Sequence, residues 1–170
     1  PTVGFKTEKP IISAVGGWCV GGALVLSMMC DLTVSAENGK FAYPEARMGF
    51  TGGLIAGLAA RIPHKIAMEM ILLCRNLDPQ RALQVGLINE VVPTGQQVEV
   101  ALKMAREMTE FSPMVLKTLK RFVTETVLAQ GPSEQSGRAQ RSLVAVREDP
   151  DSAEATAAVK EKRKPNYKSW

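Results

Sequence analysis

One stretch of twenty residues without a charge, residues 11–30, constrains the fold of this chain more than any other feature. The stretch reads IISAVGGWCVGGALVLSMMC and is long enough to cross a bilayer as one helix. Between Gly17 and Gly21 it also has the G-x-x-x-G spacing through which membrane helices pack. The first question is therefore whether it forms a membrane span or the buried centre of a water-soluble fold.

Glycines within this stretch oppose a continuous helix. Residues 16–22 contain four of them, and each costs about 1 kcal/mol of helix propensity relative to alanine. Residues 10–15 before them have the apolar character of a short buried strand, and residues 23–30 after them are good helix formers. The pattern predicts a strand, a glycine turn and a helix, and a single membrane span becomes the weaker interpretation.

Downstream, strand and helix signals alternate until about residue 93. Residues 31–36 form a β-branched run typical of a strand, and Pro63 suits the first turn of a helix. From residue 94 onward the patterns are helical, as in the segment that follows Ser112. We therefore expect an α/β region over residues 1–93 and a helical region over residues 94–170.

Composition excludes several classes of function. The net charge of +4 is spread along the chain and aromatic residues make up only 5%, which argues against a nucleic-acid interface. The single histidine, His64, cannot build a multi-histidine metal site, so we expect no metal. Three cysteines without C-x-x-C spacing indicate reduced thiols, and hence the cytoplasm, or the mitochondrial matrix in a eukaryote. We find no signal-peptide pattern near residue 1.

The glycine turn offers free backbone N–H groups where it enters the following helix. Such groups hold a phosphate or a developing oxyanion. The spacing G-G-x-x-x-G-G matches neither the P-loop nor the dinucleotide-binding motif, and apolar neighbours such as Trp18 and Leu24 favour a dry oxyanion site. From the pattern alone, a purely structural role in tight strand–helix packing remains the alternative.

The motifs in residues 9–50 resemble the crotonase superfamily, the enoyl-CoA hydratases and isomerases. The matching elements are Lys9-Pro10, Gly17, Gly21-Gly22, Cys30-Asp31 and a later run from Phe41 through Pro44-Glu45 to Gly49. The segment KIAMEMILLCRNLDPQRALQVGLINEVVP and the ending EKRKPNY are similar to later parts of the same family. This resemblance implies a crotonase-like core, a spiral of ββα turns, followed by a helical region. It also implies that the family's N-terminal third is absent from this chain.

The resemblance assigns the chemistry to two positions. Family members stabilise a thioester enolate with two backbone N–H groups, of which one matches Gly22 and the other lies in the absent portion. Hydratases of the family use two glutamates as acid and base; the second matches Glu45 and the first matches Val25, which cannot carry a proton. Without the resemblance, Glu45 would be interpreted as a solvated turn carboxylate. Because Val25 matches the position of the family's first glutamate, double-bond isomerisation is slightly favoured over hydration.

The resemblance also implies a binding pocket and partners. Gly21, Trp18 and Pro44 are expected to bind substrate beside the catalytic positions. Gly52 and Gly53 are expected to line the acyl pocket, although the loop M-G-F-T-G-G around them is shorter than usual in the family. The substrate is an acyl-CoA thioester, and coenzyme A enters only as part of it, without a separate cofactor. The family assembles as trimers or dimers of trimers.

Three hypotheses of different classes follow. The first is an acyl-CoA enzyme with enolate stabilisation at Gly22 and proton transfer by Glu45. The second is a catalytically silent crotonase-like module that binds acyl-CoA or a protein, motivated by Val25 and the altered loop. The third is a single-span membrane protein, which would need detergent for its extraction.

Overall fold

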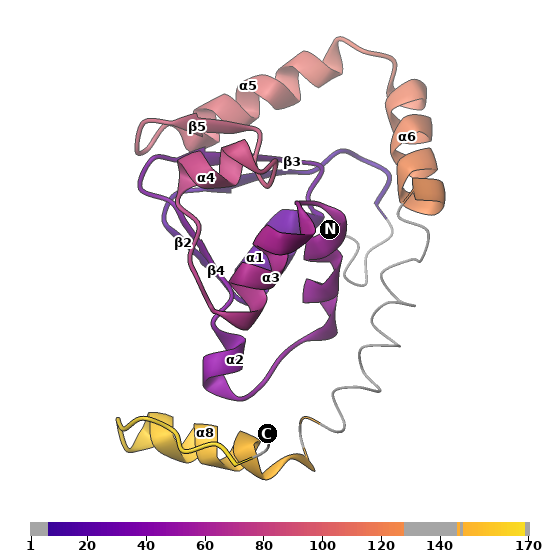
Figure 1. Cartoon of the computed structure of the whole chain (residues 1–170). Coiled ribbons are helices and arrows are strands. Elements are labelled where there is room, and N and C mark those ends of the chain that lie inside the picture. The colour runs from indigo at the N-terminus through magenta and orange to yellow at the C-terminus, as the bar shows by residue number, and fades with distance from the viewer. Residues whose placement is uncertain (1–6, 128–145, 147, 169–170) are drawn as a thin grey trace.

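The computed structural model describes residues 7–127, 146 and 148–168 (Figure 1). Its first half follows a strand–strand–helix order that occurs twice. The elements of this half are β1 (Ile12–Val15), β2 (Trp18–Val20), α1 (Gly22–Met29), β3 (Leu32–Ala36), β4 (Lys40–Ala42) and α2 (Glu45–Met48). This order is the ββα repeat expected for the core.

Two small parallel sheets result from the repeat. One sheet has the strand order β1-β3-β5, where β5 is Glu90–Val92, and the other pairs β2 with β4. Ile12 lies opposite Leu32 in the first sheet, and Trp18 lies opposite Lys40 in the second. Parallel neighbours need a crossover connection, and α1 supplies it between the two repeats. The strands at residues 10–15 and 31–36 and the helix at residues 23–30 are thereby confirmed within one or two residues.

The predicted glycine turn is only partly correct. The structure places a three-residue strand, β2, between the two glycine pairs, so the turn is divided into two separate bends. The alternation in β2 buries Cys19 and exposes Trp18 and Val20. The sequence pattern missed this strand because three residues between glycines are too few to display a period of two.

The second half is mainly helical. Its elements are the 3₁₀-helix η1 (Gly53–Ala60), α3 (His64–Leu72), α4 (Pro79–Gln84), α5 (Gln97–Thr109), α6 (Pro113–Phe122), the π-helical η2 (Val123–Val127) and α8 (Pro150–Lys160). Asp78 caps α4 by accepting a hydrogen bond from the Arg81 amide at 2.7 Å, and Asp149 caps α8 in a similar manner. Among the described residues, no strand follows residue 92. α5 lies after residue 93 but packs directly on β1 and β3, which lie before it. The division of the chain into two regions at residue 93 therefore remains a prediction.

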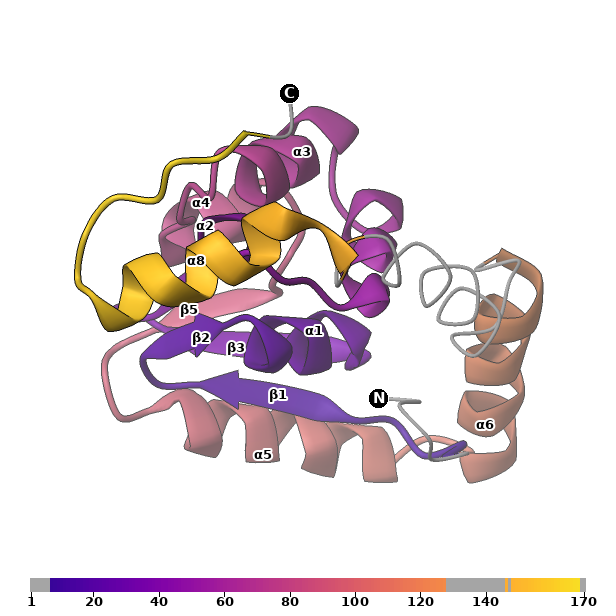
Figure 2. The ribbon, with the colours of Figure 1, turned by 90° about the horizontal axis from the view of Figure 1, so that it is seen from below.

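The core is divided by the β1-β3-β5 sheet. Its larger part lies on the side of α1 and includes the fully buried Leu24, Phe41, Leu58 and Met70. A smaller cluster on the other side joins Val34 of β3 to Ala101 of α5. Figure 2 shows the sheet between α1 and α5, which is the layered arrangement that buries both of its faces.

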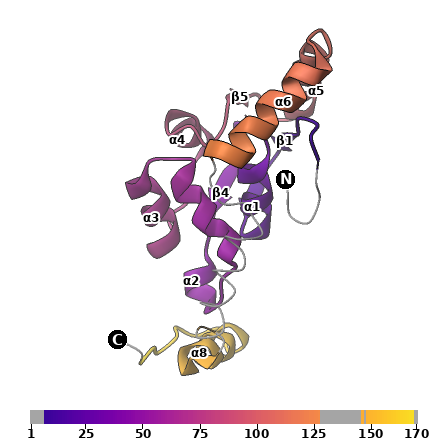
Figure 3. The same ribbon diagram turned by 90° about the vertical axis from the view of Figure 1, so that its right-hand side faces the viewer.

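The helices α5, α6 and α8 lie around the outside of this core. α5 and α8 lie at opposite ends of the molecule (Figure 3), and α6 buries none of its residues. α8 packs against α2, where the Ser152 hydroxyl donates a hydrogen bond to the Gly49 carbonyl oxygen at 3.0 Å. Within the described ranges, no helix combines the length and apolar character that a membrane crossing requires.

We predict that Gly49→Ala destabilises the protein by about 1–3 kcal/mol. Gly49 has a φ of 70°, and a Cβ at this position would overlap the Cβ of Ala155 on α8. Gly86→Ala is the matched control, because Gly86 has a φ of 77° with open space around its Cα. Urea unfolding of the full-length variants should show the larger loss for Gly49→Ala; equal losses would argue against tight packing of α8 on α2.

Candidate active site

Glu45 is the buried carboxylate of the described chain. It is the first residue of α2, directly after Pro44, which is the helix N-cap. It is only 5% exposed, and its Oε2 atom has no hydrogen-bond partner among the residues that the structure describes. Burial raises the pKa of this carboxyl above its ordinary value, because the charged form loses its hydration. An unsatisfied buried carboxylate is costly and is characteristic of functional sites. The solvated turn carboxylate considered from the sequence is therefore wrong.

Gly21 makes room for this carboxylate. A Cβ at Gly21 would overlap Oε1 of Glu45, and the backbone there has a φ of 57°, a conformation that favours glycine. The Gly21 amide is already used, since it donates to the Ala42 carbonyl oxygen at 3.0 Å. Gly21 therefore brings the carboxylate to the start of α1 and is not itself a free donor.

Gly22 provides the free amide at this point. It is the first residue of α1, and its N–H donates no hydrogen bond to any residue that the structure describes. The first intrahelical bond runs from the Val25 amide to the Gly21 carbonyl oxygen at 3.0 Å. The helix dipole adds partial positive charge at this end. The free amide of Gly22 thus follows directly after Gly21, the residue against which the Glu45 carboxylate lies.

Val25 lies one turn further along α1 and belongs to the main core. It is 8% exposed and packs among the apolar side chains of the larger cluster. A proton-transferring group is absent at this position, so Glu45 is the single carboxylate that α1 and α2 contribute to the site.

A cavity of about 350 Å³ adjoins Glu45. It lies between α2, α8 and the loop that follows α2, and it is lined by Tyr43, Glu45, Ala46, Gly49, Phe50, Thr51, Ile71, Leu72, Val146, Asp149, Asp151, Ser152 and Tyr167. The residues from α8 and from the C-terminal end were not identified from the sequence, because more than one hundred positions separate them from Glu45. Only the packing of α8 on α2 brings them together.

Tyr43 shapes the loop beside this cavity. Its hydroxyl lies 2.9 Å from the Thr51 hydroxyl oxygen and accepts a hydrogen bond from the Gly52 amide at 3.2 Å. Gly52 is therefore held by Tyr43, and Gly53 begins η1. Neither glycine is among the residues that line the cavity. Their assignment to the acyl pocket stays a prediction, which the structure does not support directly.

Trp18 lies on the exposed side of β2, with 64% of its surface accessible. The Nζ atom of Lys40 lies 5.3 Å from the centre of its ring, within the range of a cation–π contact. Trp18 does not line the cavity beside Glu45, and its role in substrate binding likewise stays a prediction.

Further observations concern His64, the potential metal ligands and the cysteines. His64 is exposed at the start of α3. The described residues contain no group of three or more potential ligands that could hold a metal ion. The cysteines are free thiols, and burial raises the pKa of Cys19 to about 11, so this thiol is a poor nucleophile at neutral pH.

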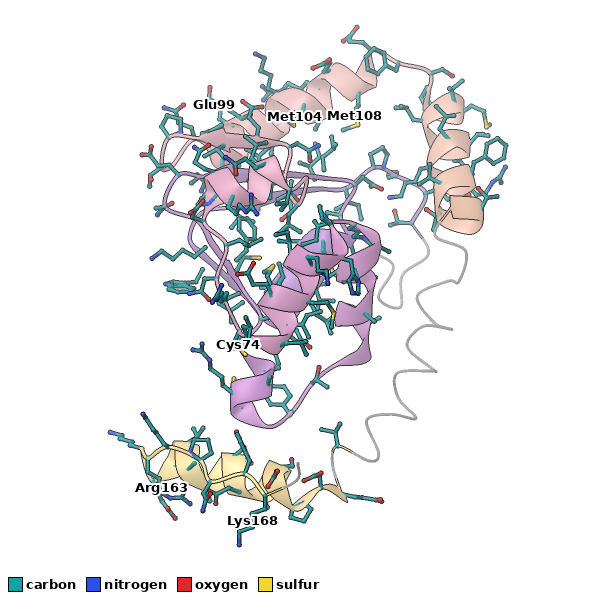
Figure 4. All side chains as sticks on the ribbon, viewed as in Figure 1. Cys74, Glu99, Met104, Met108, Arg163 and Lys168 are labelled. Atoms are coloured by element: carbon teal, nitrogen blue, oxygen red, sulfur yellow. The ribbon has the colours of Figure 1, made fainter. Side chains whose placement is uncertain are left out.

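We predict a pH-dependent stability difference for Glu45→Gln. Because the folded state raises the pKa of Glu45, its contribution to stability is complete below the unfolded value, about 4.3, and is lost as the pH rises through the folded value. The variant should therefore gain unfolding free energy relative to wild type as the pH rises above about 4. Glu99→Gln, an exposed glutamate on α5, is the control (Figure 4). A difference that is constant with pH would contradict burial of the Glu45 charge.

Comparisons with known proteins agree on one family. The sequence profile of the family "Enoyl-CoA hydratase/isomerase" matches residues 4–170. Carnitinyl-CoA dehydratase of Salmonella typhi is 33% identical over 172 residues, covering 96% of this chain and 65% of the relative. This chain therefore spans about two thirds of the length of the curated relatives that it matches.

Solved structures give the same result. The crystal structure of carnitinyl-CoA hydratase from Mycobacterium avium superposes with a TM-score of 0.88 at 32% identity, covering 96% of this chain and 64% of that one. Methylmalonyl-CoA decarboxylase superposes with a TM-score of 0.81 at 31% identity, covering 96% of this chain and 65% of that one. With a profile match over nearly its whole length and this fold, the chain belongs to the enoyl-CoA hydratase/isomerase family, and its core is the crotonase fold.

Proposed function

We propose that this chain carries the proton-transfer half of an active site that acts on an acyl-CoA thioester through an enolate. The observation that carries the proposal is the buried Glu45 carboxylate, which lies against Gly21 with one oxygen unpartnered. Gly22 offers its free amide to the thioester oxygen, where negative charge develops. Glu45 removes the proton from C2, and burial, which raises the pKa of this carboxyl, makes it a stronger base than an exposed glutamate.

Double-bond isomerisation is the reaction that one carboxylate performs most simply. Glu45 takes the C2 proton of a 3-enoyl thioester, and the electron pair moves onto the thioester oxygen as a dienolate. The protonated Glu45 then returns the same proton at C4, so that the double bond moves from C3–C4 to C2–C3. No second acid is needed, which agrees with a buried valine at position 25.

Hydration and its reverse, dehydration, form the second candidate. The names of similar proteins, a carnitinyl-CoA dehydratase and a carnitinyl-CoA hydratase, favour it. In dehydration with one carboxylate, Glu45 takes the C2 proton and passes it to the hydroxyl group that leaves C3, so that water departs and a C2–C3 double bond forms. The protons balance in this reaction, although Glu45 must first accept the proton from C2 and then donate it to the hydroxyl oxygen on C3.

Neither candidate reaction uses a metal or a redox group, and coenzyme A takes part only as a portion of the substrate. The three cysteines of the chain, all free thiols in the structure, support a reducing compartment, and we place the protein in the cytoplasm.

The decisive experiment measures turnover by the full-length protein on paired 2-enoyl-CoA and 3-enoyl-CoA substrates, with hydration and double-bond migration recorded separately. Glu45→Gln should lower kcat by about 10²–10⁴-fold, because the general base is lost, while a saturated acyl-CoA binds as in wild type. Glu99 lies on α5, which contributes no residue to the cavity beside Glu45, so Glu99→Gln is the control and should leave turnover unchanged.

Each outcome of this experiment selects one hypothesis. Migration without hydration establishes the isomerase, and hydration abolished by Glu45→Gln establishes the second candidate. If wild type and variant both bind acyl-CoA and neither catalyses either reaction, the enzyme hypothesis is rejected in favour of the catalytically silent binding module.

We also propose that the apolar surface of α5 and α6 forms contacts between copies in a homo-oligomer, a trimer or a dimer of trimers. A second cavity of about 990 Å³ lies between β1, α5 and α6, away from Glu45. Met108 of α5 contributes to its lining, and Met104 on the same helix packs on the smaller core cluster (Figure 4). On α6, Leu119 and Phe122 are each 55% exposed, contrary to the buried positions typical of such residues.

We predict that Leu119→Glu reduces the oligomer of the full-length protein to smaller species, because a charge at a buried interface costs several kcal/mol. Arg121→Glu, also on α6 and exposed, is the control for the added negative charge and should leave the mass unchanged. Light scattering coupled to gel filtration measures both. A wild-type mass equal to one chain would end this proposal.

A further inference from the structure

The loop between α2 and η1, residues 49–52, is held at its beginning by contacts with α2 and α8. The Phe50 amide donates a hydrogen bond to the Glu45 carbonyl oxygen at 3.3 Å. The Ser152 hydroxyl of α8 donates to the Gly49 carbonyl oxygen at 3.0 Å. These contacts fix where the loop leaves α2, so the course of its far end depends on other contacts.

The far end of this loop is held by the side chain of Tyr43. Its hydroxyl oxygen lies 2.9 Å from the Thr51 hydroxyl oxygen and accepts a hydrogen bond from the Gly52 amide at 3.2 Å. The Gly52 carbonyl oxygen is 3.3 Å from the same hydroxyl. The ring itself is 3% exposed and belongs to the main core cluster, so its position is fixed. One buried hydroxyl therefore holds two consecutive loop residues through side-chain and backbone atoms.

The strength of Glu45 as a base depends on the exclusion of water. Burial is the cause that raises the pKa of its carboxyl, and no charged neighbour among the described residues contributes to the shift. The other titratable groups that line the same cavity are Tyr43, Asp149, Asp151 and Tyr167, and α3 contributes only apolar side chains. A contact that keeps the wall of this cavity closed to water therefore also controls proton transfer by Glu45.

Tyr43 and the loop together form one wall of this cavity. Gly49, Phe50 and Thr51 line it with Tyr43 and Glu45. Without the tyrosine hydroxyl, the far end of the loop would lose its hydrogen bonds to the core, and its polar groups would turn to water. Water entering the cavity would then hydrate the Glu45 carboxylate, whose Oε2 atom has no partner among the described residues.

We propose that Tyr43 is a positioning residue, which holds the loop of residues 49–52 closed beside Glu45 and thereby keeps bulk water from the base. The inference rests on the proposed function, because it takes Glu45 as the group that accepts the C2 proton. Tyr43 touches no reacting atom; it acts through its hydrogen bonds to Thr51 and Gly52. Its ring fills the core, and its hydroxyl sets the position of the loop.

The first test follows the titration of Glu45 and needs no turnover. The full-length protein is labelled with carbon-13 at the glutamate carboxyl groups, and the Glu45 signal is the one that disappears in Glu45→Gln. Tyr43→Phe should move the midpoint of this titration down, towards that of the exposed Glu99, because hydration stabilises the charged carboxylate. The aromatic ring is retained in this variant, so the core stays filled.

Thr51 supplies the conservative comparison. Thr51→Val removes the second hydroxyl and should lower the midpoint less than Tyr43→Phe does, since the Gly52 amide still donates to Tyr43. Thr51→Ser keeps the hydroxyl and should titrate as wild type. Thr156→Val is the control for loss of a threonine hydroxyl, because Thr156 donates to Ser152 within α8 at 3.0 Å and does not line the cavity.

The second test measures turnover of the thioester that wild type converts. Tyr43→Phe should lower kcat about tenfold and change KM less than about twofold, because the hydroxyl acts on the base and not on the bound substrate. The acid limb of the kcat profile should move to lower pH, in parallel with the titration of Glu45. A merely structural defect would lower the amount of folded protein without moving this limb.

An unchanged titration of Glu45 in Tyr43→Phe overturns the proposal, and so does an equal shift in Thr156→Val. A fall in kcat with an unmoved acid limb also overturns it, because Tyr43 would then act on something other than the base. The proposed function is judged separately. A wild type that converts neither thioester refutes that function, while the titration of Glu45 still decides whether Tyr43 keeps water from this carboxyl.

Discussion

The site depends on the close approach of the Glu45 carboxylate to the backbone at Gly21. A side chain at Gly21 would occupy the position of the carboxylate oxygen, and the left-handed backbone there bends the chain from β2 into α1. The same residue therefore provides space for the base and directly precedes Gly22, whose amide donates to no described residue. Because the carboxylate is buried with one oxygen unpartnered, the fold tolerates an unfavourable interaction at this point.

The remaining structure supports this contact from both directions. α1 is anchored through the fully buried Leu24, and β4 pairs with β2 so that Ala42 holds the Gly21 amide. On the other side, Tyr43 ties the loop after α2, and α8 closes the cavity with its aspartates. The Glu45 carboxylate thus lies between the turn after β2 and a cavity that a helix from the distant end of the chain helps to line.

Local patterns in the sequence predicted most of the elements, and they failed where the local signal was short. The helix at residues 23–30 and the capping by Asp78 follow from propensity and side-chain hydrogen bonding, which act over a few residues. β2 was missed because three residues between glycines carry no readable period. The apolar faces predicted on the later helices exist, but α6 exposes its own, since no described element covers it.

By itself, the sequence determined the family and the position of the glycines, because these are properties of residue type and spacing. Only the tertiary structure decided that Glu45 is buried and that its carboxylate lies against Gly21. It also decided that Asp149 and Asp151 line the same cavity as Glu45. Burial and pKa depend on which distant atoms exclude water, and one hundred or more residues separate Glu45 from α8. Contacts across that separation leave no periodic or compositional trace in a single sequence.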